Sequence, residues 1–164
     1  IPHYRAGSSK LKKGDIVLLD HGVKVDGYHS DMTRTVFFGS PHAELEKIYH
    51  IVQQAQEKAL AAVKPKISTI DLDNVARSLI NEAGYGTQFV HSLGHGIGLD
   101  IHENPFLRNR EPSALIKENM AITIEPGIYI PNLGGVRIED AVIVTTDGYE
   151  DLTNRSKSLK VIPC

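Results

Sequence analysis

Several residue types that would point to particular protein classes are scarce in this 164-residue chain. The last residue, Cys164, is the only cysteine, and tryptophan is absent. A single cysteine excludes an internal disulfide and a CxxC metal site. No apolar run reaches the ~18 residues that a membrane helix needs, and no segment resembles a signal peptide. We therefore expect a cytoplasmic protein that does not bind membranes.

A strong charge of one sign is also missing. The chain has 18 basic and 20 acidic side chains, for a formal net charge of -2. Nothing in this balance provides the basic surface that nucleic acids or anionic membranes attract. With 41% hydrophobic residues, a chain of this length is expected to form one domain, residues 1–164, with a substantial core.

Short apolar runs bounded by glycine or turn residues predict β-strands. The run at 31–38 is rich in the Thr, Val and Phe that β-structure prefers. Between residues 84 and 121 the pattern is irregular and predicts no element. We expect strands over residues 15–20, 23–26, 31–38, 121–124, 128–130 and 136–145.

Two apolar stripes with spacings of three and four predict helices between these strands. Ser40 is expected to cap the first, with Pro41 in its first turn and Pro65 after its end. Ser68 is expected to begin the second, with Asp71 completing a capping box. The predicted fold class is α+β, with helices packed on a curved, mostly antiparallel sheet.

Five side chains that can bind metals lie in or next to predicted strands: Asp20, Asp31, His95, Glu125 and Glu139. Asp20 and Asp31 belong to successive strands with a short connection, so they can face each other. Two close carboxylates repel unless a cation lies between them. Either Asp could instead bond its own backbone in a turn.

A glycine-rich stretch of twelve residues contains three histidines, His91, His95 and His102. Its small residues leave room for a substrate beside the imidazoles. A lone histidine is more often a hydrogen-bonded structural residue, and the spacing does not match the HExxH zinc motif. Glu139 could pair with Arg137 on the same strand face. A buried carboxylate must otherwise bind a cation.

Four carboxylates and one imidazole form a hard, oxygen-rich ligand set. It suits Mn, Co or Fe(II), and it can accept Zn. The negative charge of the four carboxylates favours two divalent ions. Such ions would lie roughly 3.5 Å apart and hold a bridging hydroxide between them. The sequence thus predicts a dinuclear metallohydrolase.

The segments that carry these residues resemble the M24 metallopeptidases, whose "pita-bread" fold is shared by methionine aminopeptidase, aminopeptidase P and prolidase. The resemblance implies the C-terminal portion of such a catalytic domain, with helices on the outer face of the sheet and without the first βαα unit. The matching stretches are residues 11–22, 27–35, 91–105, 124–129 and 134–140.

The resemblance also implies metal-binding roles. Asp31 and Glu139 would bridge two metal ions. The resemblance favours Mn or Co, and Zn or Fe are the alternatives. Asp20 would bind one of the ions, and His95 and Glu125 would bind the other.

Further roles follow from the same resemblance. His102 would hydrogen-bond the substrate carbonyl, and Glu125 would shuttle the proton of the hydroxide. His3 and His91 would line the substrate side. Arg137 would orient Asp20 without binding a metal itself.

Residues 30–35 and 135–140 resemble the proline-directed branch of the family, because methionine aminopeptidases usually lack the arginine at position 137. The implied substrate is a short peptide with proline second, cut before the proline by an Xaa-Pro dipeptidase or an aminopeptidase P. The alternatives are a methionine aminopeptidase, a non-catalytic binding module and a metal-free hydrolase of the creatinase type. The sheet flank left open by the missing unit implies a homodimer, or association with an N-terminal portion.

Overall fold

The computed structural model describes residues 1–4 and 6–163; Arg5 and Cys164 lie outside the described residues. In the described residues, four strands are followed by two helices, a 3₁₀ turn, η1, at Gly86–Gln88, and then eight further strands. The helices are α1 (Ala43–Ala62) and α2 (Thr69–Glu82). The strands are β1 (Ile16–His21), β2 (Lys24–Val25), β3 (Tyr28–His29), β4 (Met32–Phe38), β5 (Gly94–Gly96), β6 (Glu103–Leu107), β7 (Ala121–Ile124), β8 (Gly127–Ile130), β9 (Gly134–Arg137), β10 (Asp140–Val144), β11 (Tyr149–Asp151) and β12 (Lys160–Ile162).

The strands form two larger sheets and two hairpins. β4 lies between β1 and β12, and the second sheet has the order β11-β10-β7-β5-β6. Pairs β2–β3 and β8–β9 make the hairpins. Among the described strands, β12 pairs parallel with β4 and the other pairs are antiparallel, which confirms the predicted mostly antiparallel α+β fold.

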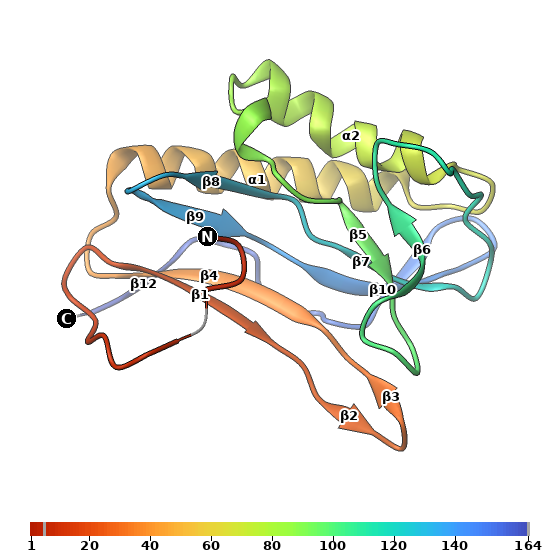
Figure 1. Cartoon of the computed structure of the whole chain (residues 1–164), viewed down its shortest axis with the longest axis horizontal. Coiled ribbons are helices and arrows are strands. Elements are labelled where there is room, and N and C mark those ends of the chain that lie inside the picture. The colour runs from red at the N-terminus through yellow and green to blue at the C-terminus, as the bar shows by residue number, and fades with distance from the viewer. Residues whose placement is uncertain (5, 164) are drawn as a thin grey trace.

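The two helices lie side by side at the top of the view in Figure 1, β1, β4 and the β2–β3 hairpin lie at the bottom, and the β8–β9 hairpin lies between them. Burying the apolar stripe of α1 against β7, β8 and β9 forms most of the core. Phe37 of β4 packs against Tyr49 of α1, with ring centroids 5.9 Å apart. The core thus fixes the sheets relative to each other through α1.

The predicted start of α2 is confirmed. Ser68 is its N-cap, and the Ser68 hydroxyl accepts a hydrogen bond from the Asp71 amide at 2.9 Å and donates to the Asp71 carboxylate at 2.6 Å. The predicted start of α1 is wrong. His42, not Ser40, is the N-cap, because Nδ1 of His42 accepts a hydrogen bond from the Glu44 amide at 3.2 Å.

Two predictions for the second half of the chain also need correction. The expected strand 136–145 is divided, because Arg137 pairs with β8 whereas Asp140 begins the ladder with β7. Ile138 and Glu139 form the bend between β9 and β10. The segment predicted to be irregular contains β5 and β6, which the glycines of β5 concealed.

None of the helices in residues 1–4 and 6–163 is both long enough and apolar enough to cross a membrane.

The two serines give a matched test of helix capping. Replacing Ser68 by Ala removes a cap and is expected to lower the free energy of unfolding by about 1 kcal/mol. Ser40→Ala changes an exposed serine outside the cap and is expected to stay within about 0.5 kcal/mol of wild type. Urea unfolding measures both; an equal loss for the two variants would contradict the assigned helix starts.

Candidate metal centre

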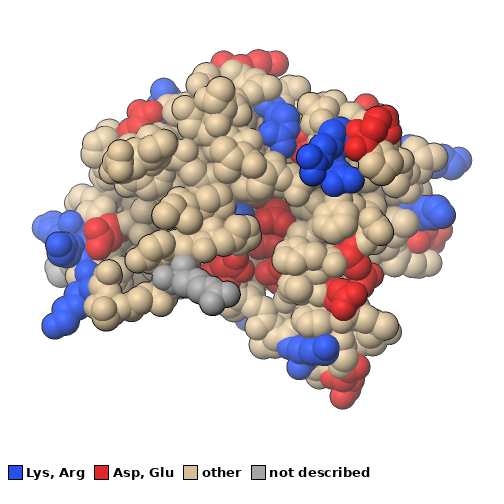
Figure 2. Space-filling model, in the orientation of Figure 1, with Lys and Arg blue, Asp and Glu red and all other residues tan. Residues whose placement is uncertain are grey.

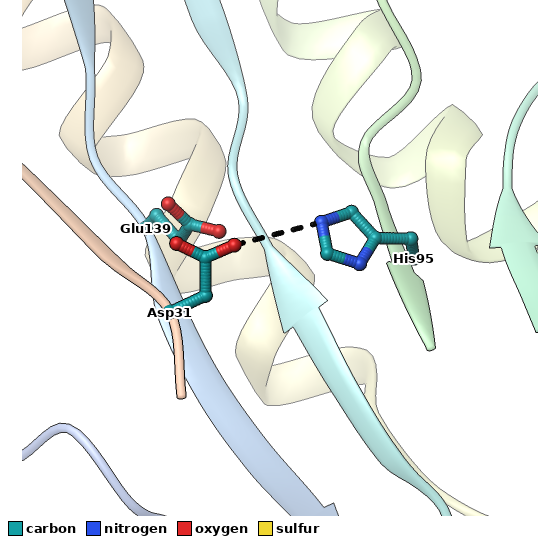
Figure 3. A group of neighbouring side chains, drawn as sticks. All are labelled: Asp31, His95 and Glu139. Carbon is teal, nitrogen blue, oxygen red and sulfur yellow. Dashed lines mark ion pairs between the residues drawn. The ribbon is translucent and has the colours of Figure 1, made fainter. Parts of the chain in front are cut away.

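Three of the predicted ligands come together although they are far apart in the sequence. Asp31 precedes β4, His95 is the middle residue of β5, and Glu139 lies in the bend after β9. One potential ligand atom from each lies within 4.8 Å of the others. Their side chains point into one shared space (Figure 3). The three residues therefore form a candidate metal site.

Glu139 has the environment expected of a metal-binding carboxylate. Its side chain is 2% exposed, and the Thr33 hydroxyl donates to Oε2 at 2.5 Å. The other oxygen, Oε1, is buried and has no hydrogen-bond partner among the described residues. Burial, and then the charges of Glu125 and Asp31, raise the pKa of Glu139 well above its ordinary value. A buried oxygen without a donor is costly, and a cation would remove that cost.

His95 presents a ring nitrogen to the carboxylates. Its Nδ1 lies 3.0 Å from the Gly96 carbonyl. A carbonyl can only accept, so Nδ1 carries a hydrogen and Nε2 faces the site. Nε2 lies 3.2 Å from Glu125 and 3.9 Å from Asp31. Burial lowers the pKa of His95, but the hydrogen bonds that its ring donates to Glu125 and to the Gly96 carbonyl outweigh burial and raise the pKa overall.

Glu125 follows β7 and borders the three residues from the side of His95. Its amide donates to the Leu93 carbonyl at 2.7 Å, and the Thr123 hydroxyl donates to its Oε1 at 3.1 Å. Burial raises the pKa of Glu125, but the hydrogen bond and charge of His95 lower it more. His95 and Glu125 thus stabilise each other as an ion pair, with Nε2 of His95 3.2 Å from Oε1 of Glu125.

Asp20 borders the site from β1, opposite Thr33 in the ladder with β4. Its carboxylate is 41% exposed and forms an ion pair with the guanidinium of Arg137. Arg137 is 2% exposed, and it also lies 3.8 Å from Glu125. In this part of the chain the ion pairs of Arg137 thus go to Asp20 and Glu125, and not to Glu139 as one alternative from the sequence proposed.

A small pocket of about 100 Å³ adjoins the carboxylates. Figure 2 shows Asp and Glu side chains gathered in a hollow near the middle of the face in view. The ring of His102 lies 4.3 Å from that of His95, and burial and the neighbouring His95 lower the pKa of His102. The pocket is lined by His3, His91, Ser92, His95, His102, Phe106, Glu125 and Arg137.

The hydrogen bonds of His91 use both of its ring nitrogens. Arg137 can only donate, and its Nη1 lies 3.1 Å from the Tyr129 hydroxyl oxygen. The Tyr129 hydroxyl then donates to Nε2 of His91 at 2.9 Å, while Nδ1 donates to the Ser92 carbonyl at 2.8 Å. Burial lowers the pKa of His91. His91 is thus neutral and fixed in one orientation.

Two residues that organise the site were not predicted from the sequence. Thr33 bonds both Glu139 and Arg137, and Tyr129 connects Arg137 to His91. Thr33 could have been found, because a residue two positions after Asp31 on a strand shares its face. Tyr129 gave no such signal, since its role depends on a hairpin partner eight residues away.

Comparison with known proteins agrees with this arrangement. The family model for metallopeptidase family M24 matches residues 1–146. The chain belongs to metallopeptidase family M24. An Xaa-Pro dipeptidase of Pyrococcus furiosus is 48% identical over 159 residues, which are 97% of this chain and 45% of that protein.

Solved structures support the same fold. The prolidase of Pyrococcus horikoshii superimposes with a TM-score of 0.94 at 46% identity, covering 97% of this chain and 46% of that one. A methionine aminopeptidase of Rickettsia prowazekii has a TM-score of 0.80 at 26% identity, covering 90% of this chain and 67% of that one. This M24 chain thus spans about half the length of the dipeptidase and prolidase that it matches.

The crowded carboxylates predict an unusual pH dependence of stability without metal. Burial, and then the charges of Asp20 and Glu125, raise the pKa of Asp31 from 3.8 to about 6. The folded protein therefore binds a proton that the unfolded chain releases, and this contribution to stability is lost as the pH rises from about 4 to about 6. Asn at this position does not ionise.

In chelator, Asp31→Asn is expected to be more stable than wild type at pH 7 by an amount on the order of 1 kcal/mol, after allowance for solvent screening. Near pH 4 the two should be alike. Urea unfolding at both pH values measures the difference. A difference that does not change with pH would show that the Asp31 carboxylate is not destabilised by its surroundings.

Proposed function

We propose that this chain carries the metal centre of a peptidase that cleaves the bond between an N-terminal residue and a following proline. The observation that carries the proposal is the convergence of Asp31, His95 and Glu139 within 4.8 Å, with a buried Glu139 oxygen that lacks a donor among the described residues. The 48% identity to an Xaa-Pro dipeptidase supports the same substrate class. Because this chain spans less than half of that relative, the activity is proposed for the whole protein.

The proposed ligand set has five members. Asp31, Glu139 and His95 would hold the metal at its centre, and Asp20 and Glu125 would hold it from the two sides. Hard oxygen donors with one imidazole favour Mn or Co, and they also accept Zn or Fe. When bound, the ions lower the pKa of a water molecule and polarise the scissile carbonyl.

Two side chains, Glu125 and His102, are proposed to transfer the proton and to stabilise the tetrahedral intermediate. Glu125 is well placed to take the proton of the attacking water and return it to the proline nitrogen that leaves, because its carboxylate lies beside the site, 3.2 Å from Nε2 of His95, and its lowered pKa leaves it free to accept a proton. His102 borders the same pocket. Its lowered pKa keeps it neutral, with one N–H to donate to the oxygen of the tetrahedral intermediate.

His3 and His91 form walls of the substrate side. Both ring nitrogens of His91 are already bonded, so we assign it to orientation and not to proton transfer. Arg137 orients Asp20 through their ion pair. Proline lacks an amide hydrogen and has a fixed φ, so a site for it needs shape complementarity, to which the Phe106 ring in the pocket contributes.

We further propose that the protein is cytoplasmic and that this chain associates with another polypeptide segment or with a second copy of itself. A groove of about 810 Å³ lies between the N-terminal residues, β1 and the β8–β9 hairpin, and its lining includes Ile1, Tyr4, Leu11 and Leu133. Apolar surface of this extent favours burial by another part of the protein or by a second copy in a homodimer. Sedimentation of the full-length protein distinguishes a monomer from a homodimer.

The metal-dependent activity has a direct assay. Full-length protein is treated with chelator, and Mn²⁺ or Co²⁺ is then restored with Xaa-Pro dipeptides, Xaa-Pro-Yaa tripeptides or Met-Ala peptides. We expect cleavage of a proline substrate only with metal, and the preferred length separates a dipeptidase from an aminopeptidase P. Cleavage of the Met-Ala peptide alone would overturn the proline assignment in favour of a methionine aminopeptidase.

A ligand variant tests the same centre at a single residue. Glu139→Ala removes a proposed bridging ligand and is expected to lower kcat/KM by more than about a hundredfold, since loss of partners around metal ligands alone costs about that much. Glu118→Ala, at an exposed glutamate, is the control and should retain wild-type activity. Undiminished activity of Glu139→Ala would refute the two-metal mechanism.

A further inference from the structure

Glu139 lies in a bend that the strand ladders do not hold. Residues 138 and 139 fall between β9 and β10, and each strand pairs with a different partner. Two backbone contacts connect the bend to β4: the Glu139 amide donates to the Thr33 carbonyl at 3.1 Å, and the Arg34 guanidinium donates to the Glu139 carbonyl at 2.5 Å. The position of Glu139 therefore depends on where Arg34 is held.

Arg34 is surrounded by acceptors and is only 9% exposed. Its Nη1 also donates to the Thr33 carbonyl at 2.9 Å. Its Nη2 donates to the Asp140 carboxylate at 2.6 Å and to the Arg155 carbonyl at 2.9 Å. Nε donates to the Ser156 carbonyl at 3.3 Å. One side chain thus joins β4, the Glu139 bend and the segment that follows β11.

Asp140 is the partner that fixes Arg34. The side chain of Asp140 is fully buried, and both of its oxygens accept from two donors. Oδ1 accepts from Arg34 and from the Thr153 hydroxyl at 2.9 Å, and Oδ2 accepts from Gln56 at 2.8 Å and Lys157 at 2.6 Å. These four donors fix the Asp140 carboxylate in one position.

Lys157 closes the arrangement from the irregular segment between β11 and β12. Its side chain is 20% exposed, and its ammonium contacts Asp140 at 2.6 Å and Asp151 at 3.9 Å. The Lys157 carbonyl accepts from the Tyr49 hydroxyl of α1 at 3.2 Å. No lining residue of the small histidine pocket belongs to this group, so its members act through Glu139 and do not touch substrate.

We propose that Arg34, Asp140 and Lys157 are positioning residues that hold Glu139 at the metal centre and thereby set the affinity of the protein for divalent metal. The inference rests on the proposed function. In the metal-free protein, Glu139 is held near Asp31 and Glu125, and the repulsion between these carboxylates costs free energy. A fixed backbone prevents the Glu139 carboxylate from rotating away from Asp31 and Glu125. Tight metal binding requires the Glu139 carboxylate to stay in that position.

Mn²⁺ binding to the full-length protein, followed by electron paramagnetic resonance, tests this directly. Lys157→Met removes the ammonium and keeps an unbranched apolar side chain. The ion pair between Arg34 and Asp140 remains in this variant. We expect Mn²⁺ to bind several-fold more weakly, which is less than the roughly ten- to hundredfold loss for direct partners of metal ligands, because Lys157 acts on Glu139 through Asp140 and Arg34. Lys157→Arg, which keeps the charge, should restore most of the affinity. Raising Mn²⁺ should return kcat of Lys157→Met toward the wild-type value.

Two controls separate positioning from general loss of stability. Ser68→Ala destabilises α2 away from the centre, and Lys64→Met removes an exposed lysine. Both should bind Mn²⁺ as tightly as wild type. Wild-type affinity in Lys157→Met would overturn the positioning role and leave the proposed function standing. Failure of the wild-type protein to bind Mn²⁺ or Co²⁺ would overturn both.

Discussion

Repulsion among buried carboxylates is the constraint on which this structure depends. Asp31 and Glu139 share a space with His95, and Glu125 stands beside them. Burial and mutual charge raise the pKa of Asp31 and of Glu139. A fold selected only for stability would not place these groups together, because uncompensated buried charge is among the most costly features of a protein interior. A cation turns that cost into binding free energy.

The surrounding fold keeps the carboxylates in place from several sides. Thr33 and Arg34, neighbours on β4, bond the Glu139 side chain and backbone respectively. Arg137 forms ion pairs with Asp20 and Glu125 and lines the small pocket beside them. The arginines thus neutralise charge around the centre, while the centre itself keeps oxygen atoms for a metal ion. The order of the strands makes this possible, because β4 contacts the β9–β10 bend directly.

Sequence patterns were sufficient for the fold class and the second helix, and three of the five proposed ligands, Asp31, His95 and Glu139, lie together in the structure. Local chemistry determines these features: an apolar stripe for α2, Ser68 for its cap, and short acidic segments at strand ends. The start of α1 at His42 was missed because capping preferences favour Ser40, whereas the structure uses the imidazole of His42. Two further features were also missed: β5, whose glycines hide the alternation, and Tyr129, whose hydroxyl meets its partners only in the folded hairpin.

The most direct measurement is anomalous X-ray scattering at the Mn absorption edge from crystals of the full-length protein grown with Mn²⁺. Two peaks roughly 3.5 Å apart, both in bonding contact with Asp31 and Glu139, are the result that this account predicts. A single peak that Glu139 does not contact, or no peak among the carboxylates at saturating Mn²⁺, would contradict it.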